Sequence, residues 1–161
     1  MQPTHTYNKY TITNVYGTVT PEQSQRIINF WQRNNAIGNP QEVRQRVHQV
    51  VLMAEDADSQ VVGVSTVYPH TFIVNMKNFF YYRMFIQPSD RVFGMMSSMT
   101  GDTYEFLKNH SMPNKPAGLV LVTENKKLMR KGMRKVIKGL GFVYIGEDNQ
   151  QQDVWLGKFE A

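Results

Sequence analysis

The hydrophobic residues of this chain form two kinds of pattern, short β-branched or aromatic runs and longer segments with helical spacing. The short runs predict strands at residues 10–16, 50–54, 61–68, 79–87, 118–123, 142–145 and 153–159. The helical spacing predicts helices after Thr20, at residues 41–47 and 91–109, and in a basic segment that ends before Gly141. Residues 69–78 are expected to be less regular. This alternation, without a repeat or a linker, predicts one mixed α/β domain over residues 1–161.

Two helices carry recognisable boundary signals. Thr20, Pro21 and Gln23 stand in the order of an N-cap residue, a proline at the first helical position and a capping-box partner. Gly141 follows the basic helix, where a residue in the left-handed conformation commonly ends a helix. Asn125 is expected to cap the start of the same helix.

Composition narrows the class of protein. The chain has 161 residues, of which 41% are hydrophobic, enough for one domain with a buried core. It has no cysteine, which excludes disulfides, cysteine-ligated zinc and a cysteine nucleophile, and which agrees with a cytoplasmic location. No hydrophobic run approaches the roughly 20 residues of a membrane span, and the first residues do not resemble a signal peptide. We therefore expect no membrane partner, and no metal site is predicted.

Positive charge is concentrated in one segment. The formal net charge is +5, and seven of the 18 Lys and Arg residues lie between Lys126 and Lys138, without which the charge would be −2. The segment can be a solvated helix face, a field that attracts an anionic cofactor or an acidic acceptor, or a nucleic-acid contact. Nucleic acid is not favoured, because the aromatic residues that could stack on bases are expected in the sheet core.

The stretch from Phe85 to Met96 combines a strand end with a helix start. An aromatic strand stops at Pro88, and Arg91-x-x-Gly94 then opens a segment with helical periodicity. The first turn of a helix has unpaired N–H groups and the positive end of the macrodipole, and a glycine lets backbone approach a ligand closely. The stretch therefore predicts an anion site, beside the simpler interpretation that the glycine only serves the turn.

Three segments resemble the GCN5-related N-acetyltransferase (GNAT) family, and the resemblance covers nearly the whole chain. Ile86-x-Pro88-x-x-Arg91-x-x-Gly94-x-Met96 resembles the acetyl-CoA motif of the family. Leu119–Asn125 is similar to a family strand that ends in asparagine, and Ile137–Phe142 is similar to the end of a family helix. The order and spacing of the three segments agree with the family pattern.

The resemblance implies a fold, an activity and a cofactor site. The fold would be a mixed, mainly antiparallel sheet of about six to seven strands flanked by about four helices. The activity would be transfer of an acetyl group from acetyl-CoA, as co-substrate, to an amine of a small molecule or protein by direct attack on the thioester. The strand end would pair with the pantetheine arm, and the helix start would cradle the pyrophosphate. The implied cofactor-binding residues are Phe85, Ile86, Gln87, Arg91, Val92, Phe93, Gly94, Met95, Met96 and Asn125.

The chain departs from the family pattern at several positions. Met96 stands where the family has Gly or Ala, so its side chain would either crowd the cofactor or point into the core. Ile137 stands where many members have a tyrosine that protonates the leaving thiolate, and isoleucine cannot donate a proton. Residues 79–83 contain no acid, although some members carry a glutamate base in this strand. Arg91 would add charge to the phosphates or remain an exposed turn residue.

Candidate catalytic residues are Glu124, Tyr81 and Tyr82. Glu124 ends a strand on the side expected for the acceptor, although an acid is also favourable near a helix cap. Tyr81 and Tyr82 point to opposite faces of their strand, so at most one of them faces the acceptor. His70 is either an exposed loop residue or an acid–base group. Proton transfer through water would need none of these side chains.

Three classes of function remain open. The first is an N-acyltransferase, with acceptor recognition expected at residues 34–40 and 69–78. The second is a relative with a weakened or lost CoA site that serves as a binding or assembly module, which Met96 and Ile137 favour. The third is a nucleic-acid-associated protein that uses the basic helix. Formation of a homodimer is left open.

Overall fold

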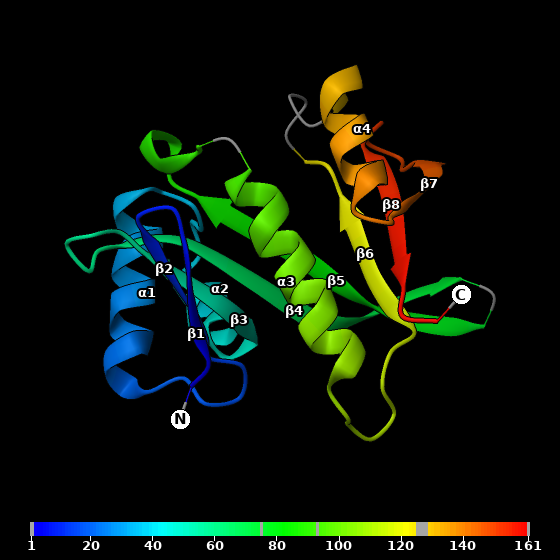
Figure 1. The fold of residues 1–161 in the computed structure, drawn as a ribbon. Coiled ribbons are helices and arrows are strands. Elements are labelled where there is room, and N and C mark those ends of the chain that lie inside the picture. The colour runs from blue at the N-terminus through cyan, green and yellow to red at the C-terminus, as the bar shows by residue number, and fades with distance from the viewer. Residues whose placement is uncertain (1, 75, 93, 125–128, 161) are drawn as a thin grey trace. The chain divides into compact units, whose positions relative to one another are not determined.

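The computed structural model describes residues 2–74, 76–92, 94–124 and 129–160. Contacts divide the chain into two compact units, which we describe separately. Unit 1 comprises Met1–Val67 and Arg83–Thr100, and unit 2 comprises Tyr68–Tyr82 and Gly101–Ala161. The described residues form four α-helices and an eight-stranded sheet with strand order β1-β2-β3-β4-β5-β6-β8-β7 (Figure 1). Strands β4 and β5 and helix α3 contribute residues to both units.

Unit 1 contains the N-terminal strands and the first two helices. Its elements are β1 (Thr4–Tyr7), β2 (Tyr10–Asn14), α1 (Pro21–Arg33), α2 (Pro40–Arg46) and β3 (Val50–Glu55), with parts of β4 (Val61–Val74), β5 (Lys77–Ile86) and α3 (Met95–Asn109). The pairs β1–β2, β2–β3 and β3–β4 are antiparallel.

Helix α1 shows how the sequence builds this unit. The Thr20 side chain accepts a hydrogen bond from the Gln23 N–H (3.1 Å), and the Gln23 side chain accepts one from the Thr20 N–H (3.0 Å), so the predicted capping box is confirmed. The buried face of the helix consists of Ile27, Phe30 and Trp31. These side chains pack in one cluster with residues of α2, β3 and β4 and anchor the helix to the sheet.

Unit 2 contains the C-terminal strands and the last helix. Its further elements are β6 (Gly118–Val122), α4 (Lys131–Gly139), β7 (Val143–Glu147) and β8 (Asp153–Lys158). Strand β5 pairs with β6 in parallel over Phe80–Tyr82, whereas β6–β8 and β7–β8 are antiparallel. Gly141 has a φ of +95° and donates its N–H to the Lys138 carbonyl (3.0 Å), which confirms the predicted end of α4.

Two predictions about strands are wrong. Strand β1 was not expected, because the short and largely exposed segment Thr4–Tyr7 has little hydrophobic pattern of its own. Residues 69–78 were expected to be irregular, but β4 continues through Pro69 to Val74. Extended backbone accommodates the fixed φ of proline, which removes only one hydrogen-bond donor from the strand.

Two helix starts also differ from the prediction. Helix α3 begins at Met95 rather than Arg91, because Gly94 has a φ of +83° and cannot lie inside a right-handed helix. Helix α4 begins at Lys131 with Arg130 at the N-cap, so the prediction that Asn125 caps it is wrong. Asn125 itself lies outside the described residues, as does Phe93. Among the described residues, no helix is both long enough and apolar enough to cross a membrane.

Candidate functional site

The turn between β5 and α3 is the predicted cofactor loop, and it lies in unit 1. After β5 ends at Ile86, a short 3-10 helix covers Pro88–Asp90. Backbone bonds then hold the loop from within: the Val92 N–H donates to the Asp90 carbonyl (2.8 Å), and the Met95 N–H donates to the Val92 carbonyl (3.2 Å). These bonds join Val92 to the 3-10 helix on one side and to the first residue of α3 on the other.

Gly94 is required in this loop for two reasons. Its φ of +83° lies in the left-handed region that residues with a side chain rarely adopt. A Cβ atom at this position would also collide with the hydroxyl oxygen of Tyr7, which comes from β1. The motif identified the glycine, but Tyr7 was missed because β1 was not predicted.

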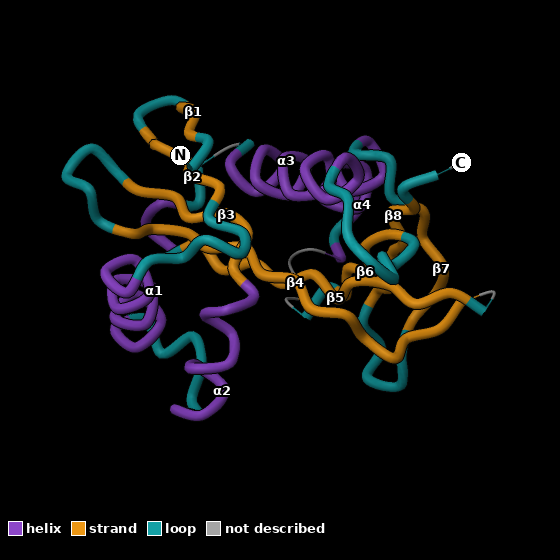
Figure 2. The backbone as a smooth tube through the Cα atoms, turned by 90° about the horizontal axis from the view of Figure 1, so that it is seen from below, coloured by secondary structure: helices purple, strands orange, loops and turns teal. Residues whose placement is uncertain are grey.

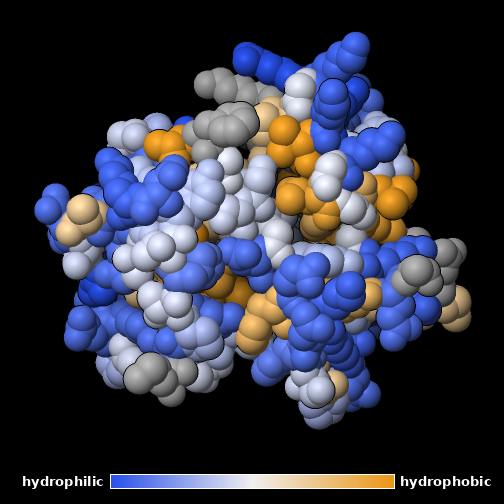
Figure 3. Space-filling view, in the orientation of Figure 1, coloured by the Kyte–Doolittle hydropathy of each residue, from blue (hydrophilic) through white to orange (hydrophobic). Residues whose placement is uncertain are grey.

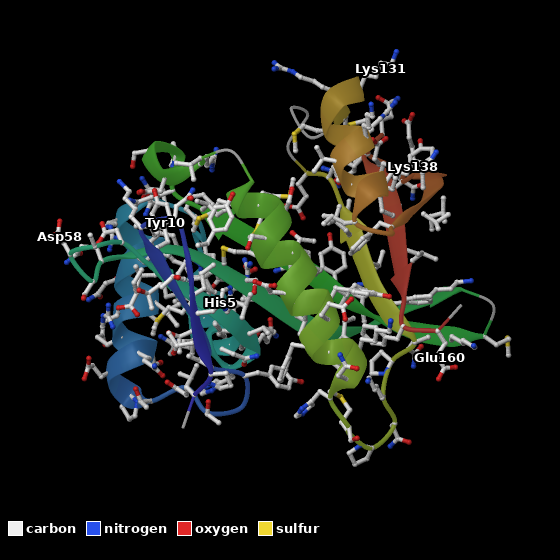
Figure 4. All side chains as sticks on the ribbon, in the orientation of Figure 1. His5, Tyr10, Asp58, Lys131, Lys138 and Glu160 are labelled. Carbon is white, nitrogen blue, oxygen red and sulfur yellow. The ribbon has the colours of Figure 1, made fainter. Side chains whose placement is uncertain are left out.

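Asp90 connects the loop to β2. Its carboxylate accepts hydrogen bonds from the Tyr10 hydroxyl (2.7 Å), the Gln87 side-chain amide (2.5 Å) and the Ser89 hydroxyl (3.3 Å); Tyr10 is labelled in Figure 4. Partial burial acts to raise the Asp90 pKa, but these three donors outweigh it and lower the pKa below its ordinary value. Burial, followed by the bond to Asp90, raises the pKa of Tyr10 to about 12, so Tyr10 stays a donor at neutral pH.

The remaining predicted cofactor residues have defined surroundings. Met95 is completely buried, whereas Met96 is half-buried and its sulfur lies 3.7 Å from the hydroxyl of Thr100, one helical turn later. The N–H groups of Met96 and Ser97 belong to the first turn of α3, which has no intrahelical acceptors for them. These two groups, at the positive end of the macrodipole, are the best placed to receive an anion.

The strand end that precedes the loop already uses some of its polar groups. The Gln87 N–H donates to the Val62 carbonyl (2.9 Å), and the Ile86 carbonyl accepts from Arg91 Nε (2.7 Å). The Arg91 guanidinium also lies 5.5 Å from the centre of the Phe85 ring. Arg91 is thus an exposed residue that is anchored at its Nε. Its other guanidinium N–H groups are of the kind that could donate hydrogen bonds to a phosphate.

Unit 2 brings together Tyr81 and Glu124, two of the predicted catalytic residues. The Tyr81 hydroxyl donates a hydrogen bond to Glu124 Oε1 at 3.3 Å. Tyr82 lies on the opposite face of β5 and is only 4% exposed, so the predicted alternation of the two tyrosines is observed. The Tyr81 ring also contacts His70, with the ring centres 5.3 Å apart. Sequence reasoning did not connect these residues, because it ended β4 before His70.

Helix α4 includes Ile137, which stands where the resemblance would place a tyrosine, and part of the basic segment. Ile137 is 1% exposed and belongs to the core of unit 2. Arg134 donates two hydrogen bonds to the fully buried carboxylate of Asp153, from Nε (2.7 Å) and Nη2 (2.9 Å). These bonds, chiefly, raise the pKa of Arg134 above its ordinary value. The outward side of α4 is hydrophilic in Figure 3, and Figure 4 marks its ends at Lys131 and Lys138.

The described residues contain no group of three or more His, Asp and Glu side chains that could hold a metal ion. The described residues offer two kinds of chemistry. Unit 1 presents helix N–H groups and an arginine for an anion, and unit 2 presents a tyrosine–carboxylate pair for proton transfer or for binding an amine.

Comparison with known proteins identifies the fold. No protein-family model and no curated protein sequence matches the chain. Solved structures are similar over nearly its whole length. One is the ribosomal-protein-S5-alanine acetyltransferase from Vibrio fischeri, with 14% identity, a TM-score of 0.63 and coverage of 98% of this chain and 97% of that chain. Another is the GNAT domain of S. lividans PAT, with 9% identity, a TM-score of 0.68 and coverage of 98% and 96%.

A third similar structure is spermidine N-acetyltransferase from Vibrio cholerae in complex with CoA and spermine. It has 14% identity, a TM-score of 0.56 and coverage of 93% of this chain and 94% of that chain. All three are acetyltransferases, and the sheet and helices match the mixed, mainly antiparallel architecture expected from the sequence. The chain has the fold of the GNAT acetyltransferases.

Proposed function

We propose that this protein is an N-acetyltransferase that transfers an acetyl group from acetyl-CoA to an amine of a small molecule or protein. The observation that carries the proposal is Gly94, whose positive φ places a tight turn directly before the first helical turn of α3. The GNAT fold supports the same conclusion, because it extends over nearly the whole chain. The fold alone would not assign the chemistry.

Each unit would contribute one part of the function. In unit 1, the N–H groups of Met96 and Ser97 would bind pyrophosphate oxygens, and Arg91 would add positive charge. The β5–β6 ladder covers Phe80–Tyr82, whereas β5 continues to Ile86, so β5 backbone beyond the ladder is available to pair with the pantetheine arm. In unit 2, the Tyr81–Glu124 pair would bind the acceptor.

The reaction would be direct attack of the neutral amine on the thioester carbonyl carbon. A carbon–nitrogen bond forms, the carbon–sulfur bond breaks, the amine loses one proton, and the CoA thiolate takes up one proton. Positioning of the two reactants can supply about 7–11 kcal/mol of the required barrier reduction. The buried Ile137 leaves protonation of the thiolate to solvent or to another group.

Thermal unfolding with and without acetyl-CoA tests the cofactor site. At a concentration 100 times the dissociation constant, the ligand should stabilise the protein by about 2.7 kcal/mol. For a chain of this length that corresponds to an increase in melting temperature of roughly 5–10 °C. Turnover is then tested with a panel of amines, and acetylation is measured by the release of free CoA thiol. An unchanged melting temperature at millimolar acetyl-CoA would refute the proposal.

A binding or assembly module is the second candidate function. Ile137 favours it, and so does β7, the last strand in the sheet order, on which Val143 is 63% and Ile145 is 43% exposed. Exposed hydrophobic strips on edge strands commonly serve association. Stabilisation by acetyl-CoA without turnover would support this candidate. Light scattering at increasing protein concentration would show whether a homodimer forms, and Ile145→Lys should dissociate a dimer that is built on β7.

Nucleic-acid binding through α4 is less favoured than either candidate. Arg134 is engaged by the buried Asp153, so one of the predicted surface cations has a structural role. A cytoplasmic location stays a prediction from the absence of cysteine.

A further inference from the structure

Two further aromatic side chains lie against the Tyr81 ring of the Tyr81–Glu124 pair in unit 2. The ring of Tyr68 is stacked on that of Tyr81, with centres 5.5 Å apart, and His70 lies 5.7 Å from Tyr68 and 5.3 Å from Tyr81. Tyr68 and His70 are two residues apart on β4, so they share one face of that strand. We call Tyr68, His70, Tyr81 and Glu124 the aromatic–acid cluster.

The cluster lies on the face of the unit 2 strands that is opposite the helices of this unit. Tyr82, the neighbour of Tyr81, is buried on the other face. That other face also carries Phe80 and Phe159, whose rings contact each other, and Phe159 contacts Tyr104 of α3. Figure 2 shows α4 and the end of α3 on one side of these strands. The three rings of the cluster are partly exposed and Glu124 is exposed, so solvent reaches them within unit 2.

This combination of groups is suited to an organic cation. Aromatic rings have negative faces that attract ammonium groups, and a carboxylate supplies a full opposite charge. An uncharged ligand could only donate a hydrogen bond to Glu124, without the attraction of opposite charges, and an anion would be repelled by it. The hydrogen bond from Tyr81 holds one Glu124 oxygen at the edge of the rings. The exposed carboxylate and the partly exposed rings thus lie together in unit 2.

We propose that the aromatic–acid cluster recognises a second amine of the acceptor in its protonated, ammonium form. This inference rests on the proposed acetyltransferase function and specifies its substrate class. The attacking amine must be neutral at the moment of reaction, so the group held by the cluster is a different one. The acceptor is therefore an amine that also carries a second positive charge, such as an aliphatic diamine.

A matched pair of probes isolates the second charge. The two probes, 1,5-diaminopentane and n-pentylamine, differ only in that charge, and calorimetric titration measures their dissociation constants on the intact protein. A partly exposed cation–π contact and an exposed ion pair together should favour the diamine by about tenfold. Glu124→Gln and Tyr68→Leu should each reduce this preference to about threefold. Glu105→Gln, which removes an exposed carboxylate of α3, should leave the preference unchanged.

Kinetics with both amines provide the second measurement. A recognition role predicts that Glu124→Gln raises KM for the diamine and leaves kcat nearly unchanged. A fall in kcat of equal size for both amines would overturn the proposal, because it would identify Glu124 as the proton acceptor. Equal binding of the two probes to the wild type would also overturn it.

Measurements of acetyl-CoA binding and of the diamine preference on the same protein distinguish this inference from the proposed function. Stabilisation by acetyl-CoA without a diamine preference would refute the aromatic–acid cluster and leave the acetyltransferase proposal intact. A diamine preference without any acetyl-CoA binding would support the cluster and refute the acetyltransferase proposal.

Discussion

Replacing Gly94 with alanine should destabilise the protein by an amount that can be separated into two causes. The first is the backbone, because Gly94 has a φ of +83°. The second is a collision, because the new Cβ would overlap the hydroxyl oxygen of Tyr7. The two causes have different remedies. Only the collision is relieved when the Tyr7 hydroxyl is removed.

The size of each contribution follows from its cause. A residue with a Cβ in the left-handed conformation costs roughly 1–2 kcal/mol. Overlap with a packed side chain costs about 1–3 kcal/mol more. The lower entropy of the unfolded chain with alanine offsets about 0.4–1 kcal/mol of this loss of stability. We expect Gly94→Ala to lower the free energy of unfolding by about 2–4 kcal/mol. In Gly94→Ala with Tyr7→Phe, the nearest remaining atom is Tyr7 Cζ at 3.4 Å, an ordinary contact, so about 1–3 kcal/mol should be recovered.

Urea unfolding of the wild type, both single variants and the double variant measures this coupling. Gly132→Ala is the matched control: Gly132 lies in α4 with nothing within 4 Å of an added Cβ, and alanine there should stabilise by about 0.5–1 kcal/mol. Gly94→Ala should also diminish the stabilisation by acetyl-CoA. A coupling energy near zero would refute the proposed role of the Tyr7 contact. So would a Gly94→Ala variant that, like the control, is not destabilised.

Three further predictions concern stability. Tyr10→Phe removes a donor from the half-buried Asp90 and should cost about 1 kcal/mol. Because the folded-state pKa of Asp90 is lowered, its stabilisation is present above its unfolded pKa and lost as pH falls through the folded pKa. Urea unfolding at several pH values should therefore show that wild type and Tyr10→Phe differ most near neutral pH and converge in acid; a constant difference would contradict this. Ile137→Ala should cost about 2–5 kcal/mol in the same assay, whereas Lys138→Ala on the exposed side of α4 should stay within about 0.5 kcal/mol. Thr20→Ala removes the N-cap of α1 and should cost about 1 kcal/mol, and a smaller loss than that of Lys138→Ala would contradict the capping role.

The features predicted correctly from the sequence depend on residues that are close together in the chain. The capping box joins Thr20 to Gln23, three positions later. The left-handed Gly141 directly follows the last turn of α4. The opposite orientation of Tyr81 and Tyr82 follows from strand periodicity alone. Such features need no knowledge of which strands pair.

The features that were missed depend on contacts between distant parts of the chain. Tyr10 and Asp90 are 80 residues apart, and no local signal connects them. Tyr7 meets Gly94 only because β1 pairs with β2, and a four-residue exposed strand has almost no pattern of its own. His70 was placed outside the sheet because residues 69–78 were expected to be less regular, whereas β4 continues to Val74.

Ile137 weakens the resemblance to an active acetyltransferase less than it first suggests. It is 1% exposed, so it serves the core and leaves no room at this position for a proton donor. A thiolate, however, is a stable leaving group, since an ordinary thiol has a pKa of about 8.5. It can depart before it is protonated, which an amine or alkoxide cannot do at neutral pH. Under the proposed function, isoleucine at this position should slow turnover without preventing it, whereas loss of the turn at Gly94 should weaken acetyl-CoA binding itself.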